Sequence, residues 1–378
     1  MRNTKFYTLL LILSLLPTTF VAGQEEKKKE ELTADGPYLL YQPDGKTRII
    51  SVNTQGQISD TTYTALPEDF SMHVTDHKGR FGFDVKLHPV KRPEWSYPQT
   101  DKVFVMSDPH GRLDCVISLL QGNNIIDENY RWNFGNNHLM VIGDIFDRGY
   151  DVPQIFWLFY KLEEEAAQAG GQVSFLLGNH EPLVTANDLR YTKDKYKQLA
   201  EKLGMTYPEL FGPDTELGKW LGTRNTMQTI GHDLYVHAGL GKDFYDHNLD
   251  IPTVNEEMSR ALFMSKAERK ALSPLTAFLY GNDGPIWYRG LVRSEEKYHP
   301  VSSDSLQMIM DRYGAQHIIV GHTIFDDIST FYDGKVIDVN VDNKKNREEK
   351  KGRAMLIENG IYYVVGDEGI QRQLNSGL

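Results

Sequence analysis

Carboxylate, imidazole and amide side chains recur in five short motifs, most of them flanked by glycine. In chain order these are Asp108-x-His110-Gly, Gly143-Asp144-x-x-Asp147-Arg148-Gly, Gly178-Asn179-His180-Glu181, His237-Ala-Gly and Gly321-His322-Thr. One such motif alone is more often a turn than a metal site. Five in succession indicate a centre for borderline divalent metals such as manganese, iron or zinc, which accept both oxygen and nitrogen ligands.

The motifs supply enough ligands for two metal ions. Asp108 and His110 lie on either side of one residue, so both are able to turn toward one ion, and Asp144 is the natural carboxylate to bridge to the other. The second ion is expected to take three further ligands: Asn179, His237 and His322. Two ions about 3.5–4 Å apart share a hydroxide and hold the oxygens of a phosphate. This predicts phosphoester hydrolysis by direct attack of a metal-bridging hydroxide, with no covalent intermediate.

Short apolar runs precede the motifs and predict how they are positioned. Strands are expected at 103–106, 138–143 and 172–177, with helices at 112–121 and 152–168 after the first two of them. Strands at 233–237 and 316–322 lead into the last two motifs. Repeated strand–loop–helix units favour an α/β architecture with neighbouring parallel strands. Each motif then lies at the carboxyl end of a strand, where open α/β sheets bind ligands.

The rest of the sequence surrounds this central pattern. Residues 36–100 are predicted to form an N-terminal β-rich extension that begins with a hairpin around Pro43-Asp-Gly. A polar, mostly helical insertion at about 187–229 is expected to form a cap. Within it, Arg224 and Asn225 are open to two interpretations, substrate binding or a solvated helix face. A polar loop at 343–353 is expected before a final hairpin at 354–366.

The five motifs, in this order, resemble the phosphoprotein-phosphatase type of calcineurin-like metallophosphoesterase. The resemblance covers Asp108 to Thr323, more than half of the chain. Within that group the sequence is most similar to the bacterial Shewanella-like phosphatases, on Asp35-Gly-Pro-Tyr, the long polar cap and Trp287-Tyr-Arg-Gly. The resemblance implies an α/β fold in which a central β-sandwich of mixed sheets is flanked by helices, in αββα layers. It places the metallophosphoesterase domain, with its helical cap, at 101–375.

The resemblance also implies roles around the metals. It assigns His180 as the general acid that protonates the leaving oxygen and Asp147 as the residue that orients its ring. Arg148 and Arg289 match the arginines that bind the substrate phosphate, a task that suits the planar guanidinium. Asn179 is assigned to this phosphate as well as to a metal. The implied cofactor is a pair of divalent ions, manganese first, with iron or zinc as alternatives.

One residue departs from the family pattern. Ser107 stands where a glycine is common at the start of the first motif, although Asp108 and His110 remain. Metal binding is therefore expected to survive this change.

The N-terminus has the pattern of a secretory signal peptide. Arg2 and Lys5 precede an apolar run at 6–16, which is short for a membrane span of about 20 residues, and small residues before Gln24 suit cleavage. A signal peptide is expected at 1–23 and a charged, disordered spacer at 24–35. An uncleaved anchor is the rival interpretation. The mature protein is expected to be periplasmic or secreted, with no stable membrane insertion.

Composition narrows the range of partners and sites. The net charge of −11 gives no general attraction for nucleic acid or anionic lipid, so a phosphorylated substrate needs a local positive site. Cys115 is the single cysteine, which rules out intramolecular disulfides and zinc sites built from several cysteines. A packing role is expected for it. The oligomeric state stays open.

Three functions remain open at this point. The leading one is a phosphomonoesterase that acts on a phosphopeptide or a small phosphoester, with serine/threonine or tyrosine phosphate on proteins favoured by the resemblance. The second uses the same centre on nucleotides or dinucleoside polyphosphates, or as a phosphodiesterase. The third is a non-catalytic phosphate- or metal-binding protein, and the intact His180 and complete ligand set count against it.

Overall fold

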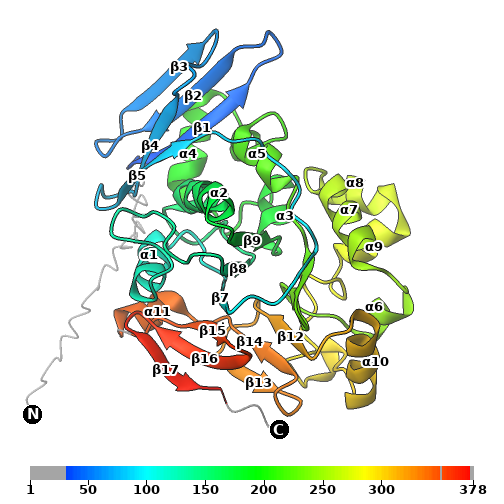
Figure 1. Ribbon diagram of the computed structural model, residues 1–378. Coiled ribbons are helices and arrows are strands. Elements are labelled where there is room, and N and C mark those ends of the chain that lie inside the picture. Colours follow the sequence, from blue (N-terminus) through cyan, green and yellow to red (C-terminus); the bar gives the residue numbers. More distant parts are fainter. Residues whose placement is uncertain (1–30, 350, 375–378) are drawn as a thin grey trace, which may run out of the picture. The chain divides into compact units, whose positions relative to one another are not determined.

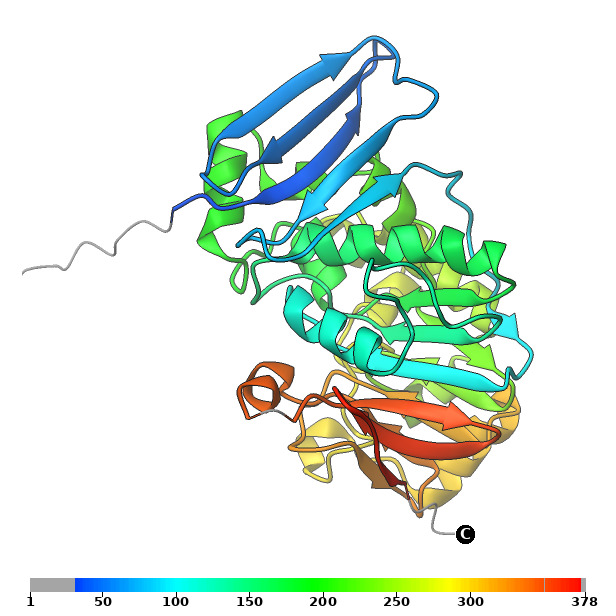
Figure 2. The ribbon, with the colours of Figure 1, turned by 60° about the vertical axis from the view of Figure 1, so that its left-hand side comes forward.

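Two six-stranded sheets form the centre of the computed structural model, which describes residues 31–349 and 351–374 (Figures 1 and 2). The first sheet has the order β17-β16-β15-β7-β8-β9, and the second has the order β13-β14-β12-β11-β10-β6. The strands of the first sheet are β7 (Lys102–Ser107), β8 (His138–Ile142), β9 (Gln172–Leu176), β15 (Ala354–Glu358), β16 (Ile361–Gly366) and β17 (Gly369–Gln373). Those of the second are β6 (Ser96–Tyr97), β10 (Met227–Ile230), β11 (Asp233–Val236), β12 (His317–Val320), β13 (Ser329–Phe331) and β14 (Val336–Asp338).

Both sheets are mixed. Strands β7, β8 and β9 are parallel neighbours, as predicted, and β15 pairs antiparallel with β7 so that the C-terminal hairpin extends the sheet. In the second sheet β12 is parallel to both β11 and β14, whereas β10 and β13 run antiparallel to their neighbours β11 and β14. The last two motifs therefore follow strands of a different sheet from the first three.

The two sheets pack face to face because their strands carry apolar residues on both faces. From β7, Val103 and Val105 enter an apolar core that also contains Tyr235 and Ile319 of the second sheet. Phe104, which points to the opposite face, belongs to a separate apolar core between the first sheet and its helices. Continuous apolar strands of this kind are typical of a sheet that is covered on both faces.

Helices cover the outer faces and complete the predicted αββα layers. On the first sheet these are α1 (Leu113–Gly122) and α2 (Val152–Gln168). On the second sheet, α7 (Ile251–Ala261) and α10 (Ser303–Tyr313) pack their apolar faces against β11 and β12. The helices α6 (Lys242–Asp246), α8 (Lys266–Leu272) and α9 (Pro274–Leu279), which precede α10 in the chain, were not predicted.

The N-terminal extension and the cap pack around α2 (Figure 1). The extension has a three-stranded sheet, β1 (Asp35–Tyr41), β2 (Thr47–Val52) and β3 (Ile58–Tyr63), and a hairpin, β4 (Ser71–Thr75) and β5 (Gly82–Lys86). The cap contains α4 (Asp194–Leu203), the 3₁₀ helix η1 (Tyr207–Phe211) and α5 (Glu216–Leu221). Apolar residues of all three parts share one core, so the extension and the cap stabilise the half of the molecule that contains the first sheet.

Several predicted boundaries are wrong. Strand β1 begins at Asp35 and Ala34 is buried, so the end of the predicted disordered spacer is ordered. Residues 1–30, with the predicted signal peptide and the rest of the spacer, lie outside the described residues. Residues 227–229, assigned to the cap, begin β10, and the predicted loop at 343–353 contains α11 (Asn343–Glu348). None of the described helices has both the length and the apolar character needed to cross a membrane.

Arg224 and Asn225 are structural, so both interpretations given for them are wrong. Arg224 is fully buried, donates to the carboxylate of Glu163 over 2.7 Å and stacks on Trp220. Asn225 is buried too and donates to the carbonyl oxygen of Glu94 over 3.0 Å. These contacts tie the end of the cap to α2 and to the chain that leads into β6.

Candidate functional site

The five motifs meet where strands of both sheets end. Asp108, Asp144 and Asn179 follow β7, β8 and β9 of the first sheet, and His237 and His322 follow β11 and β12 of the second. Face-to-face packing brings these strand ends together: Nδ1 of His237 lies 2.9 Å from the carbonyl oxygen at the end of β8. The structure thus gathers all six predicted metal ligands, His110 included, and buries each of them.

Tight backbone turns aim these side chains inward. Asp108, His110, Asp144 and His322 have φ values of 49°, 42°, 60° and 65°. This left-handed region is unfavourable for most residues and tends to occur at functional sites. The flanking glycines serve close packing, because a Cβ on Gly178 would lie 2.2 Å from the carboxylate of Asp144.

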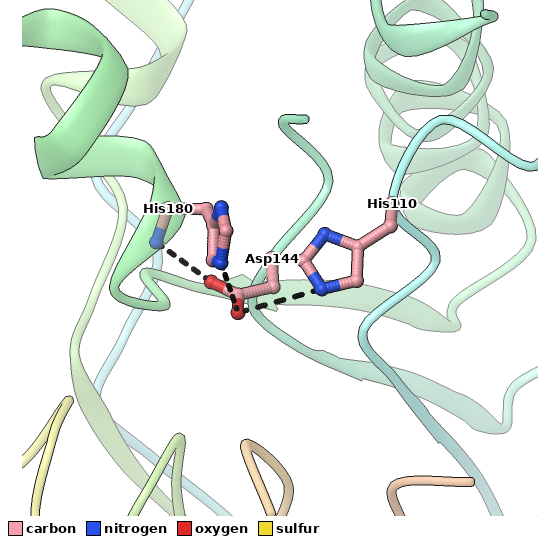
Figure 3. Close-up of side chains that lie close together, drawn as sticks. All are labelled: His110, Asp144 and His180. Atoms are coloured by element: carbon pink, nitrogen blue, oxygen red, sulfur yellow. Dashed lines mark hydrogen bonds and ion pairs between the residues drawn. The ribbon is translucent and has the colours of Figure 1, made fainter. Parts of the chain in front are cut away.

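Asp144 lies between two groups of side chains that are able to hold a metal ion. One group consists of His110, Asp144 and His180, and the other of Asp144, His237 and His322. Figure 3 shows the first: Oδ2 of Asp144 lies 3.8 Å from Nε2 of His110 and 3.9 Å from Nε2 of His180. On the other side, Oδ2 is 3.3 Å from Nε2 of His237. A carboxylate shared in this way suits the bridging position between two ions.

Hydrogen bonds orient the imidazole ligands. Nδ1 of His110 lies 2.8 Å from the carbonyl oxygen of Phe146, and Nδ1 of His237 makes the corresponding contact to Ile142. Each Nδ1–H therefore donates to a carbonyl, which leaves Nε2 to face the centre, as is usual for metal-binding histidines. Nε2 of His322 is buried with no hydrogen-bond partner among the described residues. Such a nitrogen fits a divalent ion, and so does the mixed carboxylate, imidazole and amide set.

The electrostatics of the cluster also fit cations. Burial by itself raises the pKa of Asp144, but the neighbouring imidazoles of His237 and His180 outweigh it and hold the pKa well below its usual value. Burial lowers the pKa of His110 to about 3, which keeps this ring neutral, as a ligand requires. Burial lowers the pKa of His237, but the carboxylates of Asp144 and Asp108 outweigh burial and raise the pKa to about 9. A metal that binds there therefore displaces a proton.

His180 forms a close pair with Asp147. Its Nδ1 lies 2.6 Å from Oδ2 of Asp147, and its Nε2 faces Asp144 and lies 3.4 Å from Nη2 of Arg148. Burial opposes protonation of this ring, but the carboxylates of Asp144 and Asp147 raise its pKa above the usual value. The predicted acid and its partner are thus adjacent. The closeness of His180 to Asp144 also leaves a ligand role for His180 geometrically possible.

The predicted phosphate arginines come from two different loops of the chain. Arg148 comes from the loop after β8, and its guanidinium lies over the ring of Tyr191. Arg289 donates from Nη1 to Oγ1 of Thr323, the threonine of the last motif, over 2.9 Å. The neighbouring Trp287 packs its ring against His322 at a centroid distance of 5.7 Å. Asn179, the third residue assigned to the phosphate, has its Oδ1 3.1 Å from Nε2 of His237.

Sequence reasoning missed several residues that support the ligands. The buried carboxylate of Glu181 accepts hydrogen bonds from the backbone N–H groups of Gly178, Asp144 and Ile145, so it joins two ligand loops. Nδ2 of Asn340 donates to Oδ2 of Asp108 over 2.9 Å. Asn340 follows β14, so the rule that applied to the five motifs would have found it. Ser107 also contacts the Asp108 carboxylate through its hydroxyl, a contact that glycine cannot make.

Comparison with known proteins gives one family and several relatives. Residues 101–325 match the calcineurin-like phosphoesterase family. Shewanella-like protein phosphatase 2 of Arabidopsis thaliana is 26% identical over 273 residues, which cover 61% of this chain and 68% of that protein. Shewanella-like protein phosphatase 1 of Plasmodium berghei (strain Anka) is 27% identical over 225 residues, which cover 59% of this chain and 61% of that protein.

Solved structures share the fold over nearly the whole chain. The cold-active protein-tyrosine phosphatase of a psychrophile Shewanella sp. superposes with a TM-score of 0.80 and 30% sequence identity. The superposition covers 90% of this chain and 99% of that one. This similarity therefore includes the extension and the cap as well as the two sheets.

Proposed function

We propose, from the premise that the chain belongs to the calcineurin-like phosphoesterase family and is a metal-dependent phosphatase, that it acts as a monoesterase on phosphoproteins. The observation that carries the proposal is the position of Asp144, shared by two groups of ligand atoms, with the His180–Asp147 pair beside it. A shared carboxylate suits two ions, and an adjacent histidine held by its own carboxylate suits proton transfer.

In this proposal the six buried ligands divide between two ions. Asp108 and His110 would hold the first ion, Asn179, His237 and His322 would hold the second, and the carboxylate of Asp144 would serve both. When bound, the ions would supply an activated water and positive charge for the phosphate oxygens. Manganese is our first choice, and iron or zinc also suit this ligand set.

The chain's own groups act on the phosphate and on the leaving group. Arg148 and Arg289 bind the phosphate, because a guanidinium donates to two oxygens at once. Nε2 of His180 gives its proton to the leaving oxygen as the P–O bond breaks. Asp147 accepts from Nδ1–H and stabilises the protonated ring that this step requires.

The substrate class and the location are the finer parts of the proposal. The relatives in Arabidopsis and Plasmodium are named protein phosphatases and the Shewanella relative a protein-tyrosine phosphatase, which supports phosphorylated serine, threonine or tyrosine as the target. The signal-peptide pattern at 1–23 supports action in the periplasm or outside the cell.

A substrate panel with added manganese tests this function. We expect turnover of phosphopeptides and p-nitrophenyl phosphate, and much lower turnover of bis-p-nitrophenyl phosphate and dinucleoside polyphosphates. Preference for the diester would indicate a phosphodiesterase, and preference for dinucleoside polyphosphates a nucleotide hydrolase. If the protein binds the metal but turns over none of these substrates, the result would indicate a non-catalytic phosphate- or metal-binding protein.

A further inference from the structure

The carboxylate of Asp147 is held at both of its oxygens. Oδ2 lies 2.6 Å from Nδ1 of His180, and Oδ1 accepts a hydrogen bond from the hydroxyl of Thr192 over 2.6 Å. Asp147 and Thr192 are both buried, so water does not compete for either contact. Hydrogen bonds to an ionised oxygen in such surroundings are short and strong.

The hydrogen bond from Thr192 fixes the orientation of the Asp147 carboxylate, which the contact with His180 alone does not fix. A carboxylate held only by His180 is free to rotate about its Cβ–Cγ bond, and the imidazole is free to follow. With Thr192 on the other oxygen, the plane of the carboxylate is set, and so is the direction of His180 Nδ1–H. Nε2 then stays on the side of Asp144, the centre of the proposed metal site.

Thr192 is itself anchored on both sides. The N–H of Arg148 donates to the carbonyl oxygen of Tyr191 over 3.0 Å, which joins the segment before α4 to the loop that carries Asp147. On α4, the hydroxyl of Tyr196 accepts from the N–H of Val152 at the start of α2 over 3.0 Å. Nζ of Lys195 donates to the carbonyl oxygen of Ala34, just before β1. The cap and extension thus fix the position of the Thr192 hydroxyl.

We propose that Thr192 is a positioning residue of the general acid: its hydroxyl locks Asp147 and, through Asp147, the direction in which His180 presents its proton. This inference rests on the proposed function, because it needs His180 to be the acid. Thr192 touches neither the substrate nor a metal ligand in this proposal, so its loss should alter proton delivery and leave metal binding unchanged.

The test compares Thr192→Val, which keeps the shape and removes the hydroxyl, with Thr192→Ser, which restores it. Turnover is measured on a phosphoserine peptide, whose alkoxide leaves poorly without a proton, and on p-nitrophenyl phosphate, whose leaving group does not need one. Thr226→Val is the matched control, because Thr226 is fully buried and its hydroxyl has no hydrogen-bond partner among the described residues. His180→Asn is the reference for complete loss of the acid.

We expect His180→Asn to lower phosphoserine turnover by about 10²–10⁴-fold, the usual contribution of a general acid, and to affect the nitrophenyl ester much less. Thr192→Val should show the same selectivity on a smaller scale, about 10-fold on phosphoserine, since the acid is misdirected rather than removed. Thr192→Ser should restore most of it, and Thr226→Val should show no selectivity. Metal content should stay constant in the two threonine-192 variants.

A double variant separates this inference from the function on which it rests. In the His180→Asn background, Thr192→Val should cause no further selective loss, because the residues act as one unit. If His180→Asn is selective and Thr192→Val is not, the positioning role is wrong and the function stands. If His180→Asn lowers both substrates equally, the acid assignment fails, and the role of Thr192 fails with it.

Discussion

At the scale of single residues, the site is a cluster around one carboxylate. Asp144 touches ligands from both sheets, and its N–H group is held in turn by Glu181. Residue types and spacing were enough to predict the cluster, because each ligand lies in a short glycine-flanked turn after an apolar strand. They did not indicate Thr192, whose role depends on chain segments that meet only in the folded protein.

Asp144→Asn tests the bridging role directly. The amide keeps the shape but loses the negative charge that both ions need, so we expect loss of activity and of at least one ion per chain. Metal content is measured by mass spectrometry of the elements in purified protein, with Asp114→Asn on the partly exposed side of α1 as the control. A variant with two ions and near-native turnover would contradict the bridge.

At the scale of elements, the apolar pattern predicts the buried strands and helices, but it does not predict the elements made of polar residues. Helix α2 has the predicted bounds because a continuous apolar run, Ile155 to Tyr160, follows Pro153, and proline suits the first turn of a helix. The sequence predicts a loop where α11 forms, because Asn343–Glu348 has no apolar face that would indicate a helix. The sequence leaves Arg224 open between substrate binding and a solvated helix face, because no residue near it in sequence indicates that Glu163 is its partner.

The buried contact between α4 and the N-terminal extension gives a prediction about stability. Lys195 is almost fully buried, and its Nζ lies 3.5 Å from Oδ1 of Asp35, whose pKa is raised by burial against the opposing effect of the lysine. Lys195→Ala leaves that buried carboxylate without its cation, with the hydroxyl of Tyr38 still donating to it over 3.0 Å. We expect the free energy of unfolding to fall by about 3–5 kcal/mol.

Urea denaturation of Lys195→Ala and of Lys197→Ala, a half-exposed lysine on the same helix, measures this effect. The control should change the free energy of unfolding by no more than about 0.5 kcal/mol. Equal losses in the two variants would mean that the buried pair does not hold this contact. Because α4 follows Thr192, partial loss of phosphoserine turnover should accompany the loss of stability.

At the scale of the whole molecule, the predicted family and the αββα layers are confirmed. Five ordered motifs sufficed for this, since each needs a strand end at a common edge. The local sequence pattern does not predict which strand joins which sheet, because apolar runs are alike in both sheets. The same holds for the extension, which carries no motif but shares its core with α2.

Export is the prediction that concerns the whole chain. We expect the mature protein from its native host to begin near Gln24 and to be found outside the cytoplasm, because residues 1–23 have the signal-peptide pattern. N-terminal sequencing of protein from separated cell fractions measures this. Recovery of a cytosolic form that still begins at Met1 would contradict it.

The pairing of β15 with β7 has a consequence for the order in which the molecule is made. These strands are neighbours in the first sheet, yet about 250 residues of chain separate them. A ribosome that releases the chain from its N-terminus delivers Asp108, Asp144 and Asn179 long before β15 is there to cover the free edge of β7. Contacts this distant in sequence form late, so the sheet stays unfinished until synthesis is almost over. The export predicted from residues 1–23 requires an unfolded chain, and late completion of the sheet would prolong that unfolded state.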